Sequence, residues 1–103
     1  MPTSYEELAS TLENLRDLLR QHDQQFWAKR IDDDIHFVRQ TEVFGVERVM
    51  TYFGGMGSLN DIILTQARGR SLDSAEQQLV NDQLGTLLNR SWHYAKELLG
   101  NAT

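Results

Sequence analysis

Apolar residues recur every three or four positions along most of the chain, which is the spacing of amphipathic helices. The first run comprises Tyr5, Leu8, Leu12, Leu15 and Leu19. Thr3 or Ser4 can serve as its N-cap, because each has a glutamate three residues later, as in a capping box. The pattern predicts a helix that ends near residues 21–23.

A second helix is predicted over residues 24–39. One of its faces carries Trp27, Ile31, Ile35 and Val38, with Phe26 and Phe37 beside them. A turn of about 100° per residue places Asp34 inside this apolar stripe and places Asp32 and Asp33 outside it. A carboxylate on a core face needs a partner. We therefore expect Asp34 to be less exposed than its two neighbours and partly exposed, bonded to an arginine from a neighbouring helix; a catalytic acid is the alternative interpretation.

Two further helices follow. Residues 42–53 carry Phe44, Val49 and Phe53 at helical spacing, and a glycine-rich segment ends this helix. Residues 61–65 fit either a short β segment or one or two helical turns. The last helix begins after Asp73 or Ser74 and runs to about Leu99, with a stripe made of Val80, Leu84, Leu87, Tyr94, Ala95 and Leu98. The pattern predicts an all-α fold: a single compact domain of about four helices over residues 1–103, with an irregular glycine-rich connector.

The connector has the sequence Gly54-Gly55-Met56-Gly57-Ser58-Leu59-Asn60-Asp61 and holds three of the seven glycines of the chain. In a structural interpretation, Gly54 or Gly55 adopts a positive φ and ends the preceding helix. Ser58 then caps the next segment, so Gly54, Gly55, Gly57, Ser58 and Asn60 form a structural loop. In a functional interpretation the same glycines line a recess with Asn60 and Asp61 at its rim. The spacing of a dinucleotide-binding fingerprint or a P-loop is absent.

Composition and charge narrow the classes of function. The 103 residues hold no cysteine, which excludes disulfides, thiolate catalysis and cysteine zinc sites. Asp32 and His36 have the spacing of two metal ligands, but two ligands do not make a site, so we expect no metal and no cofactor. No catalytic residue set is recognisable, and we expect that the protein is not an enzyme. The N-terminus does not resemble a signal peptide and no apolar run could span a membrane, so a cytoplasmic location is expected.

The segment from Phe53 to Leu64 resembles the core of a family of small, uncharacterised bacterial helical domains. In that core an aromatic residue is followed by Gly-Gly-Met-Gly-Ser, then by an aromatic residue or Leu, and then by Asn-Asp. The resemblance extends upstream to Gly45-Val46-Glu47-Arg48. After Leu64 the chain departs from the family pattern, since residues 65–70 replace an Asn-Gly turn. Such domains look like bacterial immunity proteins, which neutralise a toxin delivered between competing cells. The resemblance implies an all-helical fold and a protein partner, and it transfers no catalytic residue.

The net charge of −5 argues against nucleic-acid binding, which needs a basic surface, and suits a partner with a basic surface. We expect a protein-binding module, an immunity protein or antitoxin that occludes a toxin. The predicted contact residues are Asp32, Asp33, Glu42, Glu47 and Asp61. One alternative is a small-molecule-binding or enzymatic domain that uses the glycine loop and Asp61. Another is a structural homo-oligomer, with a homodimer as its simplest form.

Overall fold

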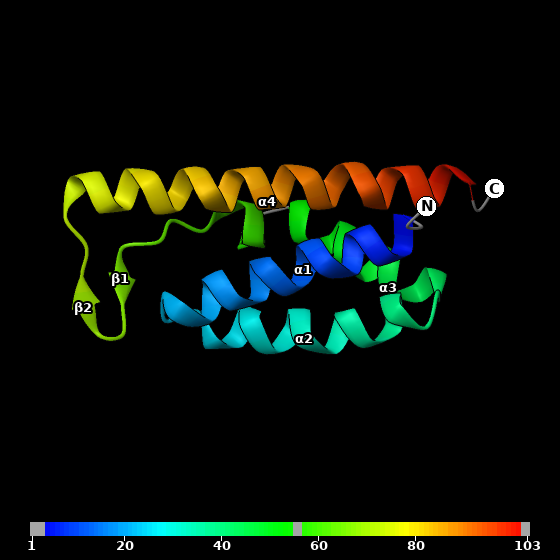
Figure 1. Cartoon of the computed structure of the whole chain (residues 1–103), viewed down its shortest axis with the longest axis horizontal. Helices are drawn as coiled ribbons and strands as arrows, with labels where there is room; N and C mark the ends of the chain where they lie inside the picture. Colours follow the sequence, from blue (N-terminus) through cyan, green and yellow to red (C-terminus); the bar gives the residue numbers. More distant parts are fainter. Residues whose placement is uncertain (1–3, 55–56, 102–103) are drawn as a thin grey trace.

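The computed structural model describes residues 4–54 and 57–101 and has the predicted architecture, a compact all-α domain (Figure 1). Its four α-helices are α1 (Ser4–Gln21), α2 (Gln25–Arg39), α3 (Val43–Met50) and α4 (Ser74–Asn101). Between α3 and α4 lie two short 3-10 turns, η1 (Thr51–Phe53) and η2 (Leu59–Asp61), and a small hairpin of β1 (Gln66–Ala67) and β2 (Arg70–Ser71).

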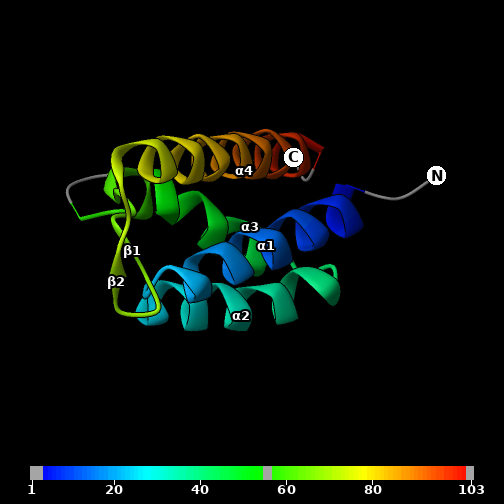
Figure 2. The same ribbon diagram turned by 60° about the vertical axis from the view of Figure 1, so that its left-hand side comes forward.

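The helix α1 lies in the middle of the molecule, with α2 along one side of it and α4 along the other (Figures 1 and 2). The helix α3 packs against both α2 and α4. The 28 residues of α4 rise about 1.5 Å each, so this helix sets the longest dimension of the domain, which measures 44 × 30 × 19 Å.

The core forms where the predicted apolar stripes meet. The centre of the core holds four fully buried leucines of α1, namely Leu8, Leu12, Leu15 and Leu19. The stripe of α2 is buried as predicted, and α4 contributes Leu84, Leu88, Ala95 and Leu98. Ser91 of α4 is also fully buried, and its hydroxyl donates to the carbonyl oxygen of Leu87 at 2.8 Å, so the stripe tolerates a polar residue.

The phase predicted for the third helix is only partly right. Val49 is buried, but Phe44 is 52% exposed and Phe53 is half-buried, whereas Tyr52 is fully buried. The α-helix ends at Met50 and continues as the 3-10 turn η1. A 3-10 turn has three residues per turn instead of 3.6, which shifts the phase and brings Tyr52 to the core side.

The helices α1 and α2 each end with a left-handed residue other than glycine. Asp23 follows α1 with φ 64° and Thr41 follows α2 with φ 57°. The amide of Thr41 donates to the carbonyl oxygen of Val38 and the amide of Glu42 donates to that of Phe37, which is the Schellman pattern. At the start of α1, Ser4 lies inside the helix and its hydroxyl donates to Glu97, while Thr3 lies outside the described residues.

Of the two glycines of which one was expected to adopt a positive φ, Gly54 has an extended backbone with φ −120°. Gly55 lies outside the described residues. Gly57 has φ +77° and is the left-handed glycine of the loop's described part. Ser58 occupies the position before η2, as predicted, but its side chain makes no capping hydrogen bond and is buried. The described part of the loop therefore ends η1 with an extended backbone at Gly54 and turns at Gly57.

Residues 62–65 form neither a helix nor a strand, with an extended backbone at Ile62, and lead into the hairpin, whose two-residue turn places Arg68 at φ 52° and Gly69 at φ 78°. Two positive φ values are typical of a type I′ turn. The hairpin is tied to the α1–α2 turn (Figure 2): the amide of Gly69 donates to Asp23 Oδ2, and His22 Nδ1 donates to the carbonyl oxygen of Gln66, both at 2.8 Å. Among the described residues, no helix is long and apolar enough to cross a membrane.

Candidate functional site

Asp34 is the centre of a buried polar cluster between α2 and α3. Its side chain is completely buried, whereas Asp32 and Asp33 are exposed. Arg48 Nε donates to Oδ1 at 2.7 Å, and the Tyr52 hydroxyl donates to Oδ2 at 2.5 Å. The low exposure and the arginine partner confirm the sequence prediction. The burial is complete rather than partial, because Tyr52, which the sequence analysis missed, covers the second oxygen.

The surroundings of Tyr52 and Arg48 shift the pKa of each of these two side chains upward. Burial raises the pKa of Tyr52 well above its usual range, and the charge and hydrogen bond of Asp34 raise it further. The hydrogen bond to Asp34 raises the pKa of Arg48. Tyr52 therefore stays a hydrogen-bond donor and Arg48 stays a cation. Arg48 contacts Asp34 only through Nε, and this bond fixes the guanidinium. Its two terminal nitrogens have no hydrogen-bond partner within the described residues.

A second arginine lies next to this cluster. The Arg30 guanidinium carbon is 5.2 Å from the Trp27 ring centroid and 5.6 Å from the Tyr52 ring centroid, within the range of a cation–π contact. Arg30 Nη2 donates to the Thr51 hydroxyl at 2.5 Å, and that hydroxyl donates to the carbonyl oxygen of Arg48 at 2.6 Å. Both arginines are thus held by the framework of α2, α3 and η1.

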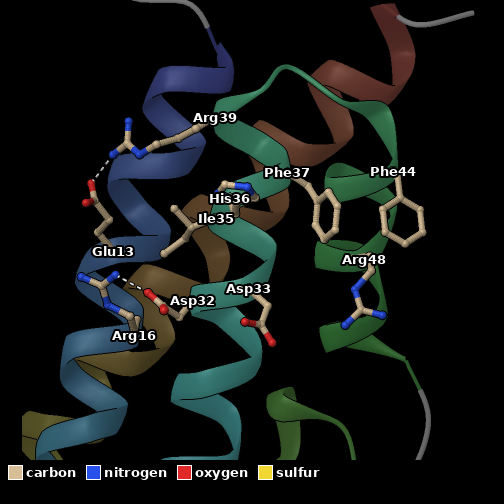
Figure 3. Close-up of a pocket in the computed structure, with 10 residues that line it drawn as sticks. All are labelled: Glu13, Arg16, Asp32, Asp33, Ile35, His36, Phe37, Arg39, Phe44 and Arg48. Atoms are coloured by element: carbon tan, nitrogen blue, oxygen red, sulfur yellow. Dashed lines mark hydrogen bonds and ion pairs between the residues drawn. The ribbon is translucent and has the colours of Figure 1, made fainter.

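A shallow groove of about 790 Å³ runs over the outer faces of α1, α2 and α3 (Figure 3). Two interhelical ion pairs cross it, Arg16 to Asp32 at 2.7 Å and Arg39 to Glu13. At its other side the exposed ring of Phe44 lies beside Phe37 and Arg48; the groove is lined by Glu13, Arg16, Asp32, Asp33, Ile35, His36, Phe37, Arg39, Phe44 and Arg48. Its acidic and arginine side chains are equal in number, so the groove is of mixed charge rather than acidic.

All five predicted contact residues are exposed, but only two of them line the groove. Asp32 and Asp33 line the groove, where Asp32 pairs with Arg16 and Asp33 pairs with Lys29 at 3.3 Å. Glu42 precedes α3, Glu47 lies on α3, and Asp61 belongs to η2. These last three residues have no ion pair within the described part of the chain and lie outside the groove.

The glycine loop and the candidate metal ligands lie elsewhere. Asn60 lines a separate hollow between η2 and α4, together with the exposed Ile63. Asp32 is engaged by Arg16, and His36 Nε2 lies 3.1 Å from the amide nitrogen of Gln40. Over residues 4–54 and 57–101, no group of three or more histidine, aspartate or glutamate side chains is arranged to hold a metal ion.

Comparison with known proteins gives one family match. No curated protein and no solved structure matches the chain significantly. A family described as "Domain of unknown function (DUF6966)" matches residues 20–73, slightly more than half of the chain. The matched region includes α2, α3, the glycine loop and the hairpin, and with them Asp34, Arg48 and Tyr52. The chain therefore belongs to the DUF6966 family.

Proposed function

We propose that this protein is a protein-binding module that acts without catalysis, as an immunity protein or antitoxin that occludes a bacterial toxin in the cytoplasm. The observation that carries the proposal is the set of large aromatic rings left on the surface of α2 and α3. Phe26 is 73% exposed and Phe44 is 52% exposed. Arg48 lies over the Phe44 ring, with its guanidinium carbon 5.9 Å from the centroid. Aromatic residues and arginine are the side chains that dominate the energetics of protein interfaces.

The acidic residues have a different part in this proposal. The net charge of −5 attracts a partner with a basic surface over distances of about 8 to 10 Å at moderate salt. Rim charges of this kind mainly set the rate of association and its salt dependence, while the apolar centre sets the rate of dissociation. Glu42, Glu47 and Asp61 suit the rim, because reversing them breaks no ion pair within the described residues.

The first test identifies the partner. The product of a neighbouring toxin-like gene should kill cells when it is expressed alone and should be neutralised when this protein is expressed with it. A complex of defined stoichiometry should appear by native mass measurement. If the two proteins do not associate and cells are not protected, the immunity proposal is wrong. A neighbouring metabolic gene cluster would favour the enzymatic alternative, and a native mass of two or more copies without any partner would favour the homo-oligomer.

The second test locates the contact surface. Glu47→Lys on α3 should slow association with the partner about tenfold at low salt without changing the thermal stability, because Glu47 is exposed and makes no ion pair with any residue that the structure describes. Asp82→Lys on α4 is the matched control, since it changes the net charge by the same amount at another exposed position. If both variants slow association equally, only the total charge matters and α3 does not lie at the interface.

A further inference from the structure

The cleft between the first half of α2 and the end of α3 has a local charge opposite to that of the whole chain. It is a hollow of about 670 Å³ lined by Gln25, Phe26, Lys29, Arg30, Asp33 and Arg48. We call it the α2–α3 cleft. It carries three cationic side chains and one carboxylate in a protein whose net charge is −5. This concentration of positive charge favours a ligand that carries negative charge.

Both arginines of the cleft are held in place before any ligand arrives. Asp34, fully buried and fixed by Tyr52, holds Nε of Arg48. Trp27, Tyr52 and Thr51 hold the guanidinium of Arg30. In Figure 3 the Arg48 side chain extends from α3 with its terminal nitrogens turned away from the Phe44 ring. A guanidinium that is already positioned loses less entropy for each hydrogen bond it forms.

The donors that remain match an oxyanion. Arg48 makes no hydrogen bond from its terminal nitrogens within the described residues, and Arg30 makes one, from Nη2. The Nε of Arg30 has no partner there either, but it is buried, so the donors open to a ligand are the terminal nitrogens. Lys29 adds a mobile third cation, since its side chain is 79% exposed and its only described partner is Asp33. Guanidinium groups bind planar carboxylates and phosphates through parallel N–H donors.

The carboxylate of Asp33 decides between these two anions. It lines the same cleft and would repel a phosphate dianion more strongly than a single carboxylate. The exposed ring of Phe26 lies edge-on to Trp27, with the centroids 5.6 Å apart, and provides an apolar wall beside the cations. We infer that the α2–α3 cleft binds one glutamate or aspartate side chain of a partner protein, with an apolar neighbour of that residue packed on Phe26.

This inference rests on the proposed function and adds a feature of the partner. The negative charge of the whole chain steers a basic surface toward it, and the cleft then selects a site on that surface where one acidic side chain stands. Long-range attraction and local recognition act at different distances, because salt screens the first more strongly than the second. The pairing would fix the orientation of the partner rather than supply most of the affinity.

The test uses the isolated protein and capped peptides. The ¹⁵N-labelled protein is titrated with acetyl-Leu-Glu-Leu-amide, and the Nε–H signals of arginine and the Trp27 indole signal are followed. We expect the Arg30 and Arg48 signals to shift with an apparent Kd on the order of 1 mM. The peptide acetyl-Leu-Gln-Leu-amide has the same shape without the charge and should cause no such shift. If the two peptides behave alike, or if inorganic phosphate binds more tightly than the glutamate peptide, the inference is wrong.

Variants locate the binding. Arg30→Gln should weaken binding of the glutamate peptide about tenfold, whereas Arg20→Gln, on an exposed part of α1 with no described side-chain partner, should leave it unchanged. If Arg30→Gln does not fold, Lys29→Gln at the cleft rim replaces it, with an expected loss of about threefold. Equal affinity in the folded cleft variant and in the Arg20 control would overturn the inference. A protein that binds the peptide in the cleft but protects no cell would contradict only the immunity function.

Discussion

A buried carboxylate must have both its charge and its oxygen atoms satisfied, and Asp34 has one partner for each oxygen. Arg48 supplies the opposite charge to Oδ1, and Tyr52 supplies a neutral donor to Oδ2. Removing one partner of such a group leaves a buried acceptor without a hydrogen bond, which costs more than the bond itself contributes. Removing a single atom from this cluster should therefore change the free energy of unfolding measurably.

Tyr52→Phe removes only the hydroxyl and keeps the buried ring. We expect it to lower the free energy of unfolding by roughly 1–3 kcal/mol, which corresponds to a fall in Tm of about 4–8 °C for each kcal/mol in a domain of this size. Thermal unfolding followed by circular dichroism measures the change. Tyr94→Phe is the matched control, because Tyr94 is half-buried and makes no hydrogen bond within the described residues. Equal stability of the two variants would mean that the hydroxyl of Tyr52 contributes nothing.

At the scale of the residue, the sequence predicts whether a side chain is buried better than it predicts which groups that side chain bonds. The low exposure of Asp34 follows from its angle within the stripe of α2, which needs only the helical repeat. The role of Tyr52 could not be predicted in the same way. It depends on the change from an α-helix to a 3-10 turn after Met50, and no glycine or proline marks that change before Gly54.

The start of α4 shows how one element is fixed by neighbouring residues in the chain. Asp73 Oδ1 accepts the amide of Glu76 at 2.8 Å, and Glu76 Oε1 accepts the amide of Asp73 at 3.1 Å, so the two side chains form a reciprocal capping box. Arg70 of the hairpin donates to the same glutamate at 3.1 Å. The sequence pattern predicts Asp73 or Ser74 as the cap, and in the structure Asp73 has this role.

The hydrogen bonds from Arg70 and from the Asp73 amide lower the pKa of Glu76 to about 2, from 4.5. A carboxylate with a lowered pKa in the folded state stabilises the fold above its unfolded pKa, and this contribution is lost as the pH falls toward the folded value. Glu76→Gln can keep the amide contact but loses the charge. We expect its Tm to lie below that of the wild type at pH 7, and the difference to shrink between pH 4.5 and pH 2.

Glu47→Gln is the control for this titration, since Glu47 is exposed and has no ion pair within the described residues. Its Tm should follow that of the wild type at every pH. A difference between wild type and Glu76→Gln that stays constant from pH 7 to pH 2 would mean that the charge of Glu76 does not contribute to the cap.

The glycine loop marks the limit of prediction at the scale of elements. That the helical segment stops at the loop follows from its composition, and in the structure α3 ends at Met50 while the 3-10 turn η1 continues to Phe53, just before Gly54. Which glycine turns left-handed does not follow, because every glycine is equally permissive. Tyr52 and Leu59, on either side of the loop, are buried in the tertiary structure. With these two side chains in the core, the backbone is extended at Gly54 and left-handed at Gly57. Gly45 has another role: a Cβ there would lie 2.8 Å from that of Phe37, so α2 and α3 pack closely at this point.

At the scale of the whole molecule, the surface depends on how the helices assemble, and the helical repeat alone does not contain this information. The five acidic residues predicted as a contact set are all exposed, and the helical angle predicts this for Asp32 and Asp33, yet only these two meet in one groove. The cationic α2–α3 cleft could not be recognised in advance, because Arg30 and Arg48 are separated in sequence and come together only when α3 folds back on α2.

The long helix α4 is unevenly supported along its length. From Leu84 onward it contributes Leu84, Leu88, Ala95 and Leu98 to the core, whereas none of its first ten residues, 74–83, is buried. The side chain of Asn81 connects the first half to the extended segment before the hairpin. Its Oδ1 accepts the amide of Leu64 at 2.8 Å, and its Nδ2 donates to the carbonyl oxygen of Leu64 at 2.9 Å. One amide side chain thus satisfies both backbone groups of a buried residue.

We therefore expect the two halves of α4 to open independently. In native-state hydrogen exchange, the amides of residues 78–83 should be less protected than those of residues 88–98, since few buried contacts hold them. Asn81→Ala leaves both backbone groups of Leu64 unpaired and should speed exchange in residues 78–83 about tenfold, with a smaller effect on residues 88–98. Asn89→Ala, an exposed position on the same helix, should change neither region. Equal acceleration of both regions in Asn81→Ala would show that α4 opens only with the whole domain, and that the contact between Asn81 and Leu64 supports the global fold rather than one end of it.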